Sequence, residues 1–335
     1  MPRSGSGIVT VRPFEERDLE AASDLCDRAR AEDASVEPFS QRLSIIATGP
    51  RALLPLWRVA EGEDGALHGI AFAALREARQ EATRRTSVEL YAAVLPALRR
   101  QGLGRQLLEP SLAWAQEEAA QGPVALRSRV RDSSSKPAAG MPVAARPGEA
   151  FLRALGFVLT SAQLQLHRQG PRPPSPRPIP RLALRLLNAH RPPDVADFKR
   201  LSDAAWAGAE ETFPSRADEL AQLISELDRF ILLAQLEGRP AGYLSAIRLG
   251  RAFGIEEVAV MPEYRRAGIG RELVAESLRL EQSAAAILTV SETNRPARAL
   301  YKSLGFSQSG RRLIFERVSG AAGRTGLPDR TPALL

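Results

Sequence analysis

Apolar and polar positions along this chain follow an order of strands and helices that occurs twice. In the second half, residues 255–260 read Ile-Glu-Glu-Val-Ala-Val, a run rich in β-branched side chains that predicts a strand ending at Met261-Pro262. A charged turn follows. From Gly270 onward the apolar residues have the spacing of one buried helix face. A strand, a glycine turn and a helix are therefore predicted in that order.

The same patterns predict the other elements of a mixed α/β fold. Strands are expected at residues 8–12, 56–60, 69–75, 87–94, 182–187, 230–236, 241–249, 286–290 and 311–318. Helices are expected at residues 16–30, 39–47, 195–206, 216–227 and 296–304, and directly after the glycine turns.

The turn after the strand at residues 255–260 has the composition of an anion-binding site. It reads Arg-Arg-Ala-Gly-Ile-Gly-Arg from residue 265 to residue 271. The first N–H groups of a helix have no acceptor within the helix, and the helix dipole favours an anion there. The glycines allow close approach of the backbone to a phosphate, and the arginines add charge-assisted donors. The pattern predicts a phosphate-binding turn, although a purely structural helix start would also explain two glycines.

The turn and its flanking residues occur twice in the chain. Residues 94–104 match residues 260–270 at an offset of 166, and residues 155–157 match residues 304–306 at an offset of 149. The first copy therefore has 17 more residues between its glycine turn and its Gly-Phe pair. We place them in a loop at residues 132–146, because Ser133-Ser134-Ser135-Lys136-Pro137 and Gly140-Met141-Pro142 favour a loop. The chain is predicted to be a tandem repeat.

A proline-rich stretch separates the two copies. Residues 170–181 contain six prolines among twelve residues, which predicts an extended, semi-rigid spacer, with an SH3-type ligand as the alternative. The predicted domains are residues 1–169 and residues 182–318, joined by this linker. Residues 319–335 are expected to form a disordered tail.

Two motifs resemble those of a known family. Arg265-x-x-Gly268-x-Gly270, directly after a Val-x-Pro strand end, resembles the acyl-CoA signature of the GNAT (Gcn5-related N-acetyltransferase) superfamily. Residues 294–306 resemble the second signature, Asn-x-x-Ala-x-x-Leu-Tyr-x-x-x-Gly-Phe. The resemblance implies two tandem GNAT-like domains, each with a mixed, splayed central sheet flanked by helices.

The resemblance also implies an activity and a cofactor. The expected reaction is direct transfer of an acetyl or other acyl group from acetyl-CoA to a primary amine of a small molecule or peptide (EC 2.3.1.-). The residues that would bind the cofactor are Val258, Ala259 and Val260 for the pantetheine, Arg265, Arg266, Ala267, Gly268, Ile269, Gly270 and Arg271 for the diphosphate, and Asn294 for the cofactor arm or a water. The alternative role of Asn294 is to cap the helix at residues 296–304.

Three residues are candidates for proton transfer. Tyr301 matches the family tyrosine that protonates the leaving thiolate. The alternative is that Tyr301 is an aromatic residue that fills the core. Glu256 and Glu257 lie on the strand beside the expected thioester. Because adjacent strand residues face opposite ways, we expect one of them to reach the cleft and act as the base. We prefer Glu257 as the base, because Glu256 is in phase with Val258 and Val260. A bulge in the strand would reverse this preference. The alternative is that the residue is a solvated carboxylate without a catalytic role.

The first copy departs from the pattern where the chemistry would occur. Leu152 stands at the position of Tyr301, and Ala145 stands at the position of Asn294. Leucine cannot donate a proton, so we expect this copy to be catalytically weak or inactive and the C-terminal copy to catalyse. A second cofactor site remains possible in the first copy, at Val94, Arg99, Arg100, Gln101, Gly102, Leu103 and Gly104.

The composition of the chain excludes several classes of function. The chain has 335 residues, a net charge of +7 and three lysines, so its basic charge is nearly all arginine, with no dense basic run interleaved with aromatics. We therefore expect no nucleic-acid partner. Cys26 is the single cysteine and the three histidines are scattered, so neither an intramolecular disulfide nor a metal site is expected.

No apolar run is long enough to span a membrane and no signal core follows Met1, so a cytoplasmic monomer or homodimer is expected. Two alternatives to a small-molecule enzyme stay open. One is a non-catalytic acyl-CoA-binding or regulatory module, and the other is a protein N-acetyltransferase.

Overall fold

The computed structural model describes residues 8–33, 52–76, 86–131, 147–170, 174–175, 177–188, 190–205, 229–249, 252–281 and 285–319. The chain forms two compact units. Unit 1 contains the chain up to Ser161 together with the strand residues from Arg312, and unit 2 contains Ala162–Arg311. The helices predicted at 39–47 and 216–227 and the loop predicted at 132–146 lie outside the described residues, as does the tail beyond Ser319.

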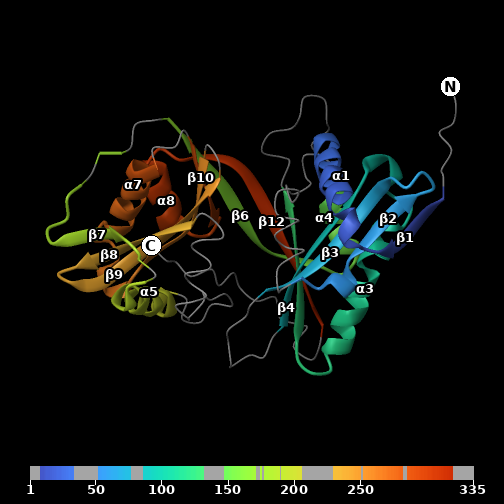
Figure 1. The fold of residues 1–335 in the computed structure, drawn as a ribbon, viewed down its shortest axis with the longest axis horizontal. Coiled ribbons are helices and arrows are strands. Elements are labelled where there is room, and N and C mark those ends of the chain that lie inside the picture. The colour runs from blue at the N-terminus through green and yellow to red at the C-terminus, as the bar shows by residue number, and fades with distance from the viewer. Residues whose placement is uncertain are drawn as a thin grey trace. The chain divides into compact units, whose positions relative to one another are not determined.

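Unit 1 is a mixed sheet with helices on both faces. Its elements in chain order are β1 (Val9–Pro13), α1 (Leu19–Glu32), β2 (Arg58–Gly62), β3 (Leu67–Arg76), β4 (Thr86–Val94), α3 (Leu103–Glu118), β5 (Val124–Arg131) and α4 (Pro147–Ala154). The strand order is β1-β2-β3-β4-β5, followed by the second half of β12 (Ser307–Ser319). The β4–β5 pair is parallel. Helices α1 and α3 lie on opposite sides of the sheet (Figure 1).

Unit 2 repeats this plan. Its elements are β7 (Leu182–Leu186), α5 (Pro192–Ala205), β8 (Arg229–Leu236), β9 (Arg239–Leu249), β10 (Ala252–Val260), α7 (Ile269–Glu281), β11 (Ala285–Ser291) and α8 (Arg295–Ser303). The strand order is β6-β11-β10-β9-β8-β7, where β6 is Val158–Gln169, and the β10–β11 pair is parallel. Helices α7 and α8 cover one face and α5 covers the other (Figure 1).

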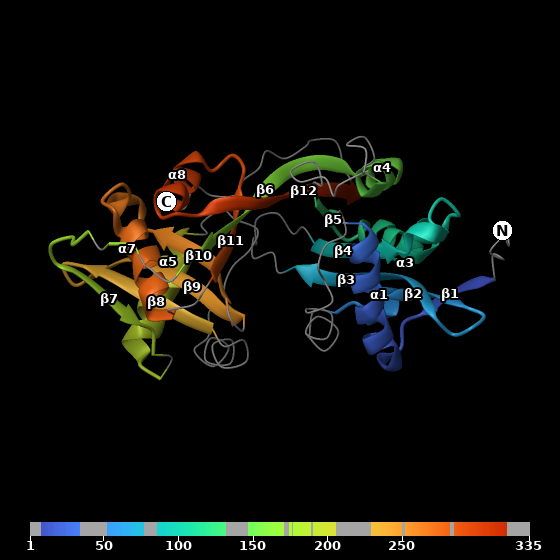
Figure 2. The same ribbon diagram turned by 90° about the horizontal axis from the view of Figure 1, so that it is seen from above.

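The two units exchange their last strands. β6 ends the first sequence copy, but its residues 163–169 pair with β11 of unit 2. β12 ends the second copy, but its residues 312–319 pair with β5 of unit 1. Figure 2 shows both strands as long ribbons. The predicted boundaries at residues 1–169 and 182–318 follow the sequence repeat, whereas each compact unit takes one strand from the other copy. A truncation between the copies would therefore remove a strand from both sheets.

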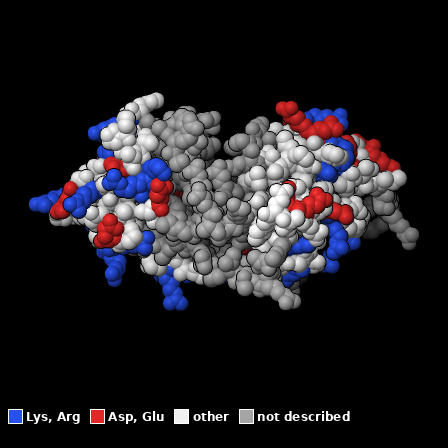
Figure 3. Space-filling view, turned by 90° about the horizontal axis from the view of Figure 1, so that it is seen from below, with Lys and Arg blue, Asp and Glu red and all other residues white. Residues whose placement is uncertain are grey.

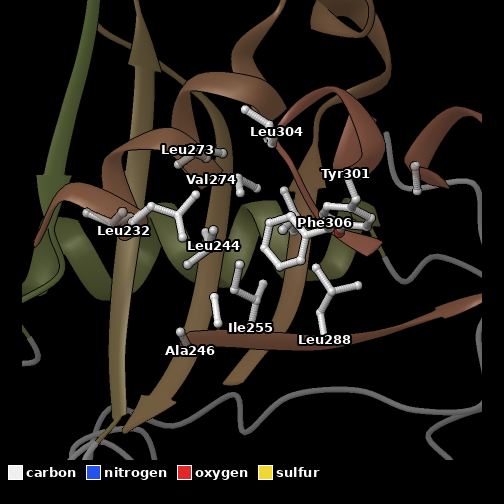
Figure 4. Packing of buried hydrophobic residues seen from close by; sticks show 14 of the residues in the cluster. Leu232, Leu244, Ala246, Ile255, Leu273, Val274, Leu288, Tyr301, Leu304 and Phe306 are labelled. Carbon is white, nitrogen blue, oxygen red and sulfur yellow. The ribbon is translucent and has the colours of Figure 1, made fainter. Parts of the chain in front are cut away.

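The predicted apolar faces form the cores. In unit 2, Leu273 and Val274 of α7, Tyr301 of α8 and Leu304 directly after α8 belong to a cluster that also contains Ile255 of β10. Figure 4 shows these side chains packed together above the sheet. The opposite face packs Phe198 and Leu201 of α5 on β8 and β9. In unit 1, α1 packs in the same way on Ile70, Phe72 and Tyr91.

On the side drawn in Figure 3, Lys and Arg are interspersed with Asp and Glu. None of the described helices is long and apolar enough to cross a membrane. Within the described ranges, no three His, Cys, Asp or Glu side chains are grouped so that they could hold a metal ion.

Candidate functional site

In each unit, two parallel strands separate before they end. The β4–β5 ladder runs from Thr86, opposite Val124, to Leu90, opposite Ser128. The β10–β11 ladder likewise stops where Ile255 lies opposite Leu288. Because β4 continues to Val94 and β10 to Val260, their last residues lie outside the parallel ladder. The predicted splay is thus present in both copies, and it leaves the β11 side of Val258, Ala259 and Val260 outside the parallel ladder.

The two predicted anion-binding turns have the same backbone conformation. Each follows a short 3-10 turn, and each has an arginine with a φ of 66°, Arg100 in unit 1 and Arg266 in unit 2. Gly102 has a φ of 85° and Gly268 a φ of 89°, so both adopt a left-handed conformation that favours glycine. Helices α3 and α7 begin one residue later. Left-handed residues within such a turn point successive N–H groups toward one side, which suits an anion.

An arginine in each turn ties the turn to the preceding strand. Nε of Arg99 donates to the carbonyl of Val94 at 2.9 Å, and Nε of Arg265 donates to the carbonyl of Val260 at 3.2 Å. Arg99 also forms an ion pair of 2.5 Å with Asp33, at the end of α1. These arginines therefore have a structural role that sequence reasoning missed, and their contact with a cofactor stays a prediction.

Unit 1 contains a cavity of about 410 Å³ where its parallel strands separate. Its wall is formed by residues 90–94 of β4, residues 128–130 of β5, residues 98–100 and 102–105 of the turn, and one side of α4. Phe151 of α4 would lie 3.0 Å from a Cβ atom placed on Gly104, so a side chain at this position would have to displace the phenyl ring slightly. A largely apolar cavity with a cationic turn at its edge fits a pantetheine arm with a diphosphate. Six of the seven predicted second-site residues line it, namely Val94, Arg99, Arg100, Gly102, Leu103 and Gly104, whereas Gln101 is not part of the cavity wall.

The linker contacts the turn of unit 2. Ile179 packs beside Gly268, with its Cδ1 atom 3.5 Å from the position of a Cβ atom on that glycine. The backbone N–H of Arg177 donates to Oε1 of Glu272 at 3.1 Å, and Arg271 donates to the carbonyl of Ser175 at 3.2 Å. Glu272 is buried and forms an ion pair of 2.9 Å with Arg271. The predicted diphosphate ligand Arg271 is thus engaged by the protein, and Glu272 is a neighbour that the sequence motif did not reveal.

Tyr301 lies in the core of unit 2. Its ring packs edge-on against Phe306, with 5.7 Å between the ring centroids, and both belong to the cluster shown in Figure 4. Burial raises the pKa of Tyr301 well above its ordinary value, so the phenol keeps its proton. Asn294 accepts a hydrogen bond of 3.1 Å from the N–H of Ala297 and caps α8, which is the alternative considered for it. Neither contact tests the predicted role in catalysis or cofactor binding.

The expectation that Glu256 and Glu257 face opposite ways is wrong. The pairing of β10 with β9 shifts between Ile255 and Glu257, which is the bulge that could reverse the alternation. Glu257 then lies opposite Ser245 and accepts a hydrogen bond of 2.7 Å from the Tyr243 hydroxyl. Glu256 forms an ion pair with Arg229 of β8, whose Nη1 also donates to Ser245 at 2.9 Å. Both carboxylates therefore reach partners on the face of the sheet covered by α5.

The same face of unit 1 carries aromatic side chains instead. Gly69 lies opposite Val94 just as Gly242 lies opposite Val260, so Tyr91 and Phe72 correspond to Glu257 and Ser245. Phe72 stacks on Tyr91 with 4.9 Å between centroids, and it contacts Trp57 at 5.0 Å. The β3–β4 register has no shift between residues 69 and 94. The first copy thus lacks the paired carboxylates at these positions, in addition to having the buried Leu152 in place of Tyr301.

Comparisons with known proteins agree with this arrangement. The model of the acetyltransferase (GNAT) family matches residues 28–141 and 196–306, together more than half of the chain. A mycothiol acetyltransferase of Saccharomonospora viridis is 31% identical over 77% of this chain and 81% of its own. A second one, from Clavibacter michiganensis subsp. michiganensis, is 29% identical over 88% of this chain and 90% of its own.

A shorter match is the N-alpha-acetyltransferase RimI of Mycobacterium tuberculosis, 38% identical over 92 residues, which are 26% of this chain and 58% of RimI. Among solved structures, a GCN5-related N-acetyltransferase from Sphaerobacter thermophilus has a TM-score of 0.71 at 18% identity, covering 96% of this chain and 97% of its own. A tandem GNAT protein from the clavulanic acid biosynthesis pathway has a TM-score of 0.65 at 20% identity, covering 93% of this chain and 98% of its own. At these identities the two structures show that the fold is shared.

Proposed function

Because this chain belongs to the acetyltransferase (GNAT) family, we propose that it transfers an acetyl group from acetyl-CoA to a primary amine and that the C-terminal copy catalyses the transfer. The enzyme class, an N-acetyltransferase, follows from the family. The assignment to the C-terminal copy depends mainly on one observation. The bulge of β10 brings Glu256 and Glu257 to one face among polar partners, whereas the corresponding positions of unit 1 are aromatic or aliphatic.

The proposed chemistry needs two proton transfers on opposite sides of β10. Acetyl-CoA supplies an acetyl group activated as a thioester, so the C–S bond breaks as the C–N bond forms. Glu257 takes the proton that the attacking amine must lose, directly or through a water. Tyr301 gives a proton to the departing sulfur, and its raised pKa ensures that the phenol is protonated beforehand. Glu257 lies on the α5 face and Tyr301 on the face of α7 and α8, so each can act on a different reactant.

We assign the cofactor of the reaction to the turn at residues 265–271 and to the main chain of Val258, Ala259 and Val260. The left-handed backbone at Arg266 and Gly268 and the end of the β10–β11 ladder at Ile255 support this assignment. The matching turn and the cavity of unit 1 support a second acyl-CoA site there. With Leu152 and Tyr91 in place of the acid and the base, unit 1 would bind the cofactor without transferring its acyl group.

The acceptor class proposed first is a small-molecule amine of the mycothiol type. Two mycothiol acetyltransferases match most of this chain in both copies, which favours a related acceptor. A second candidate is the α-amino group of a peptide or protein, because a region of 92 residues resembles RimI more strongly. This match is no longer than one of the two copies and does not account for the tandem arrangement. The peptide or protein acceptor is therefore the second candidate.

Mass spectrometry of reaction mixtures tests the proposal. The full chain with acetyl-CoA is given three acceptors separately, namely a mycothiol-type amine, glucosamine and an Ala-starting peptide. We expect a gain of one acetyl group on the mycothiol-type amine, lost with Glu257→Gln and strongly reduced with Tyr301→Phe. Binding of CoA by calorimetry with no acetylated product and no loss of thioester would support a non-catalytic acyl-CoA-binding protein instead.

A further inference from the structure

The two neighbouring carboxylates of β10 differ in what holds them. Glu256 is exposed but forms an ion pair with Arg229, a guanidinium that is 7% exposed. The same Nη1 donates to the hydroxyl of Ser245 at 2.9 Å, so arginine, glutamate and serine form one network. A proton placed on Glu256 would break its ion pair with this buried guanidinium, which is a costly change. Glu256 is therefore poorly suited to accept a proton from an amine.

Glu257 has a different partner. Its Oε2 atom accepts a hydrogen bond of 2.7 Å from the hydroxyl of Tyr243, a neutral donor. Protonation of Glu257 disturbs a hydrogen bond but separates no ion pair with Tyr243, and a phenol hydroxyl can also act as an acceptor. The Tyr243 hydroxyl can therefore stay hydrogen-bonded to Glu257 in both its carboxylate and its carboxylic acid state.

The position of the Tyr243 hydroxyl is set by the fold. Tyr243 is fully buried on β9, and its backbone lies opposite Ala259, two residues beyond Glu257. Its ring packs edge-on against Phe198 of α5, with 5.0 Å between centroids. Strand pairing and helix packing together fix where the phenol oxygen lies. A donor held in this way restricts the rotamers of the glutamate that it contacts.

Unit 1 provides an internal comparison. By the register of β3 with β4, Ile70 occupies the position of Tyr243 and Tyr91 that of Glu257. Within the described parts of the two sheets, the tyrosine donor and the glutamate therefore occur together in unit 2 and are replaced together in unit 1. A buried tyrosine hydroxyl needs a hydrogen-bond partner, and in unit 2 the partner is this glutamate.

From these contacts we propose that Tyr243 is a positioning residue for Glu257, and that Arg229 and Ser245 hold Glu256 as an ion pair that does not take the proton. The inference rests on the proposed function, and it adds the residue that orients the base. The titratable and charged groups near Glu257 include Tyr243 from β9, Arg229 from β8 and Glu256 on its own strand. Helix α5 contributes the uncharged ring of Phe198.

The test compares hydroxyl deletions in the full chain. Tyr243→Phe keeps the ring against Phe198 and removes the donor, and Tyr264→Phe is the matched control in the same unit. Rates are measured with acetyl-CoA and the mycothiol-type amine from pH 6 to pH 10. For Tyr243→Phe we expect kcat to fall about tenfold at pH 7, because a misplaced general base loses part of its contribution to the rate. The KM for acetyl-CoA should stay within about twofold of the wild-type value. The deficit should shrink as pH rises and solvent removes the proton of the amine.

Three outcomes distinguish this inference from the proposed function on which it rests. Wild-type kcat in Tyr243→Phe, together with loss of activity in Glu257→Gln, would overturn the inference and leave the proposed function intact. A loss that is equal at every pH and accompanied by a lower melting temperature would show a merely structural tyrosine. No acetylation of any amine by the wild type would overturn both. If Tyr243→Phe fails to fold, Phe198→Leu takes its place. This variant loosens the packing of the Tyr243 ring but keeps the Tyr243 hydroxyl, and it should also lower kcat.

The variant Glu256→Gln provides a further test of the inference. Because Glu256 is held by Arg229, its replacement should lower kcat less than Glu257→Gln does. A larger loss in Glu256→Gln, without a lower melting temperature, would reverse the assignment of the two carboxylates.

Discussion

The backbone N–H of Arg177 donates a hydrogen bond of 3.1 Å to Oε1 of Glu272, which joins the linker to the first turn of α7. The same carboxylate forms an ion pair with Arg271. A buried negative charge thus lies beside the turn proposed to bind a diphosphate. At the corresponding position of unit 1, 166 residues earlier, stands Gln106, which is uncharged. The two turns share a backbone conformation but differ in local charge.

Glu272→Gln should therefore improve cofactor binding in the C-terminal copy. Removing one negative charge close to a diphosphate, and releasing Arg271, is expected to lower KM for acetyl-CoA by about two- to fivefold, the size expected for a partly screened charge pair. Initial rates at varied acetyl-CoA measure this. The matched change Gln106→Glu should weaken CoA binding to unit 1 in calorimetry. An unchanged or higher KM in Glu272→Gln would show that this carboxylate does not oppose the cofactor.

Tyr301→Phe should lower kcat about a hundredfold and leave KM for acetyl-CoA nearly unchanged, since the lost hydroxyl would act on the leaving sulfur and not in binding. Burial raises the pKa of Tyr301 above its ordinary value of 10.0, so a tyrosine that must be protonated stays active as pH rises. The wild-type kcat profile should accordingly show no fall assignable to Tyr301 up to about pH 10. Wild-type turnover by Tyr301→Phe would leave this residue with a role in packing against Phe306.

An ion pair in unit 1 makes a prediction about stability. Arg12 donates two hydrogen bonds of 2.7 and 2.8 Å to the buried Asp18, and these hydrogen bonds hold the pKa of Asp18 below its ordinary value of 3.8. A lowered folded pKa contributes stability that is fully present above pH 4 or so and is lost as pH falls through the folded pKa. Asp18→Asn should lower the free energy of unfolding by about 1–3 kcal/mol at pH 7.

Denaturant titrations at pH 7 and at pH 3 check this prediction. The difference between wild type and Asp18→Asn should shrink at the lower pH, because the unfolded wild type takes up a proton on Asp18 there before the folded state does. A difference that is equal at both values would mean that the charge of Asp18 contributes little.

Cys26 should be unreactive in the native protein. Its side chain is 1% exposed on α1, and burial raises the pKa of the thiol to about 11, so little thiolate is present at pH 8. Reaction with a disulfide reagent should be slow in buffer and complete in denaturant. Rapid labelling of the native chain would contradict the packing of α1 on the sheet. Slow labelling would also let free CoA be followed by its thiol without background from the enzyme.

The sequence was sufficient for features that local patterns determine. The two glycine turns, the strands before them and the helices after them form where the residues 94–104 and 260–270 predict them, because glycine conformation and helix starts depend on nearby residues. β5, α4 and β6 were not predicted, although the alternating residues 124–131 of β5 carry a strand signal. The predicted final strand began four residues late, since β12 starts at Ser307.

Features that depend on distant contacts could not be predicted in this way. The bulge at Glu256 is a property of the register between β9 and β10, which no single strand encodes. Tyr243 meets Glu257 only because these strands pair, and Arg229 reaches Glu256 from the strand beyond. The exchange of β6 and β12 between the units involves partners more than a hundred residues away. The contact of Ile179 with Gly268 likewise requires the folded linker.

The central claim is that the C-terminal copy performs the transfer, and a matched pair of glycine substitutions tests it most directly. Gly102 and Gly268 have φ values of 85° and 89° in equivalent turns, so tryptophan introduces similar backbone strain at each. The measurement is the steady-state rate of acetylated product formation by Gly102→Trp and Gly268→Trp in the full chain, with melting temperatures alongside. The account predicts that Gly268→Trp abolishes turnover while Gly102→Trp retains most of it. Full activity in Gly268→Trp with loss in Gly102→Trp would contradict it and place the chemistry in the first copy.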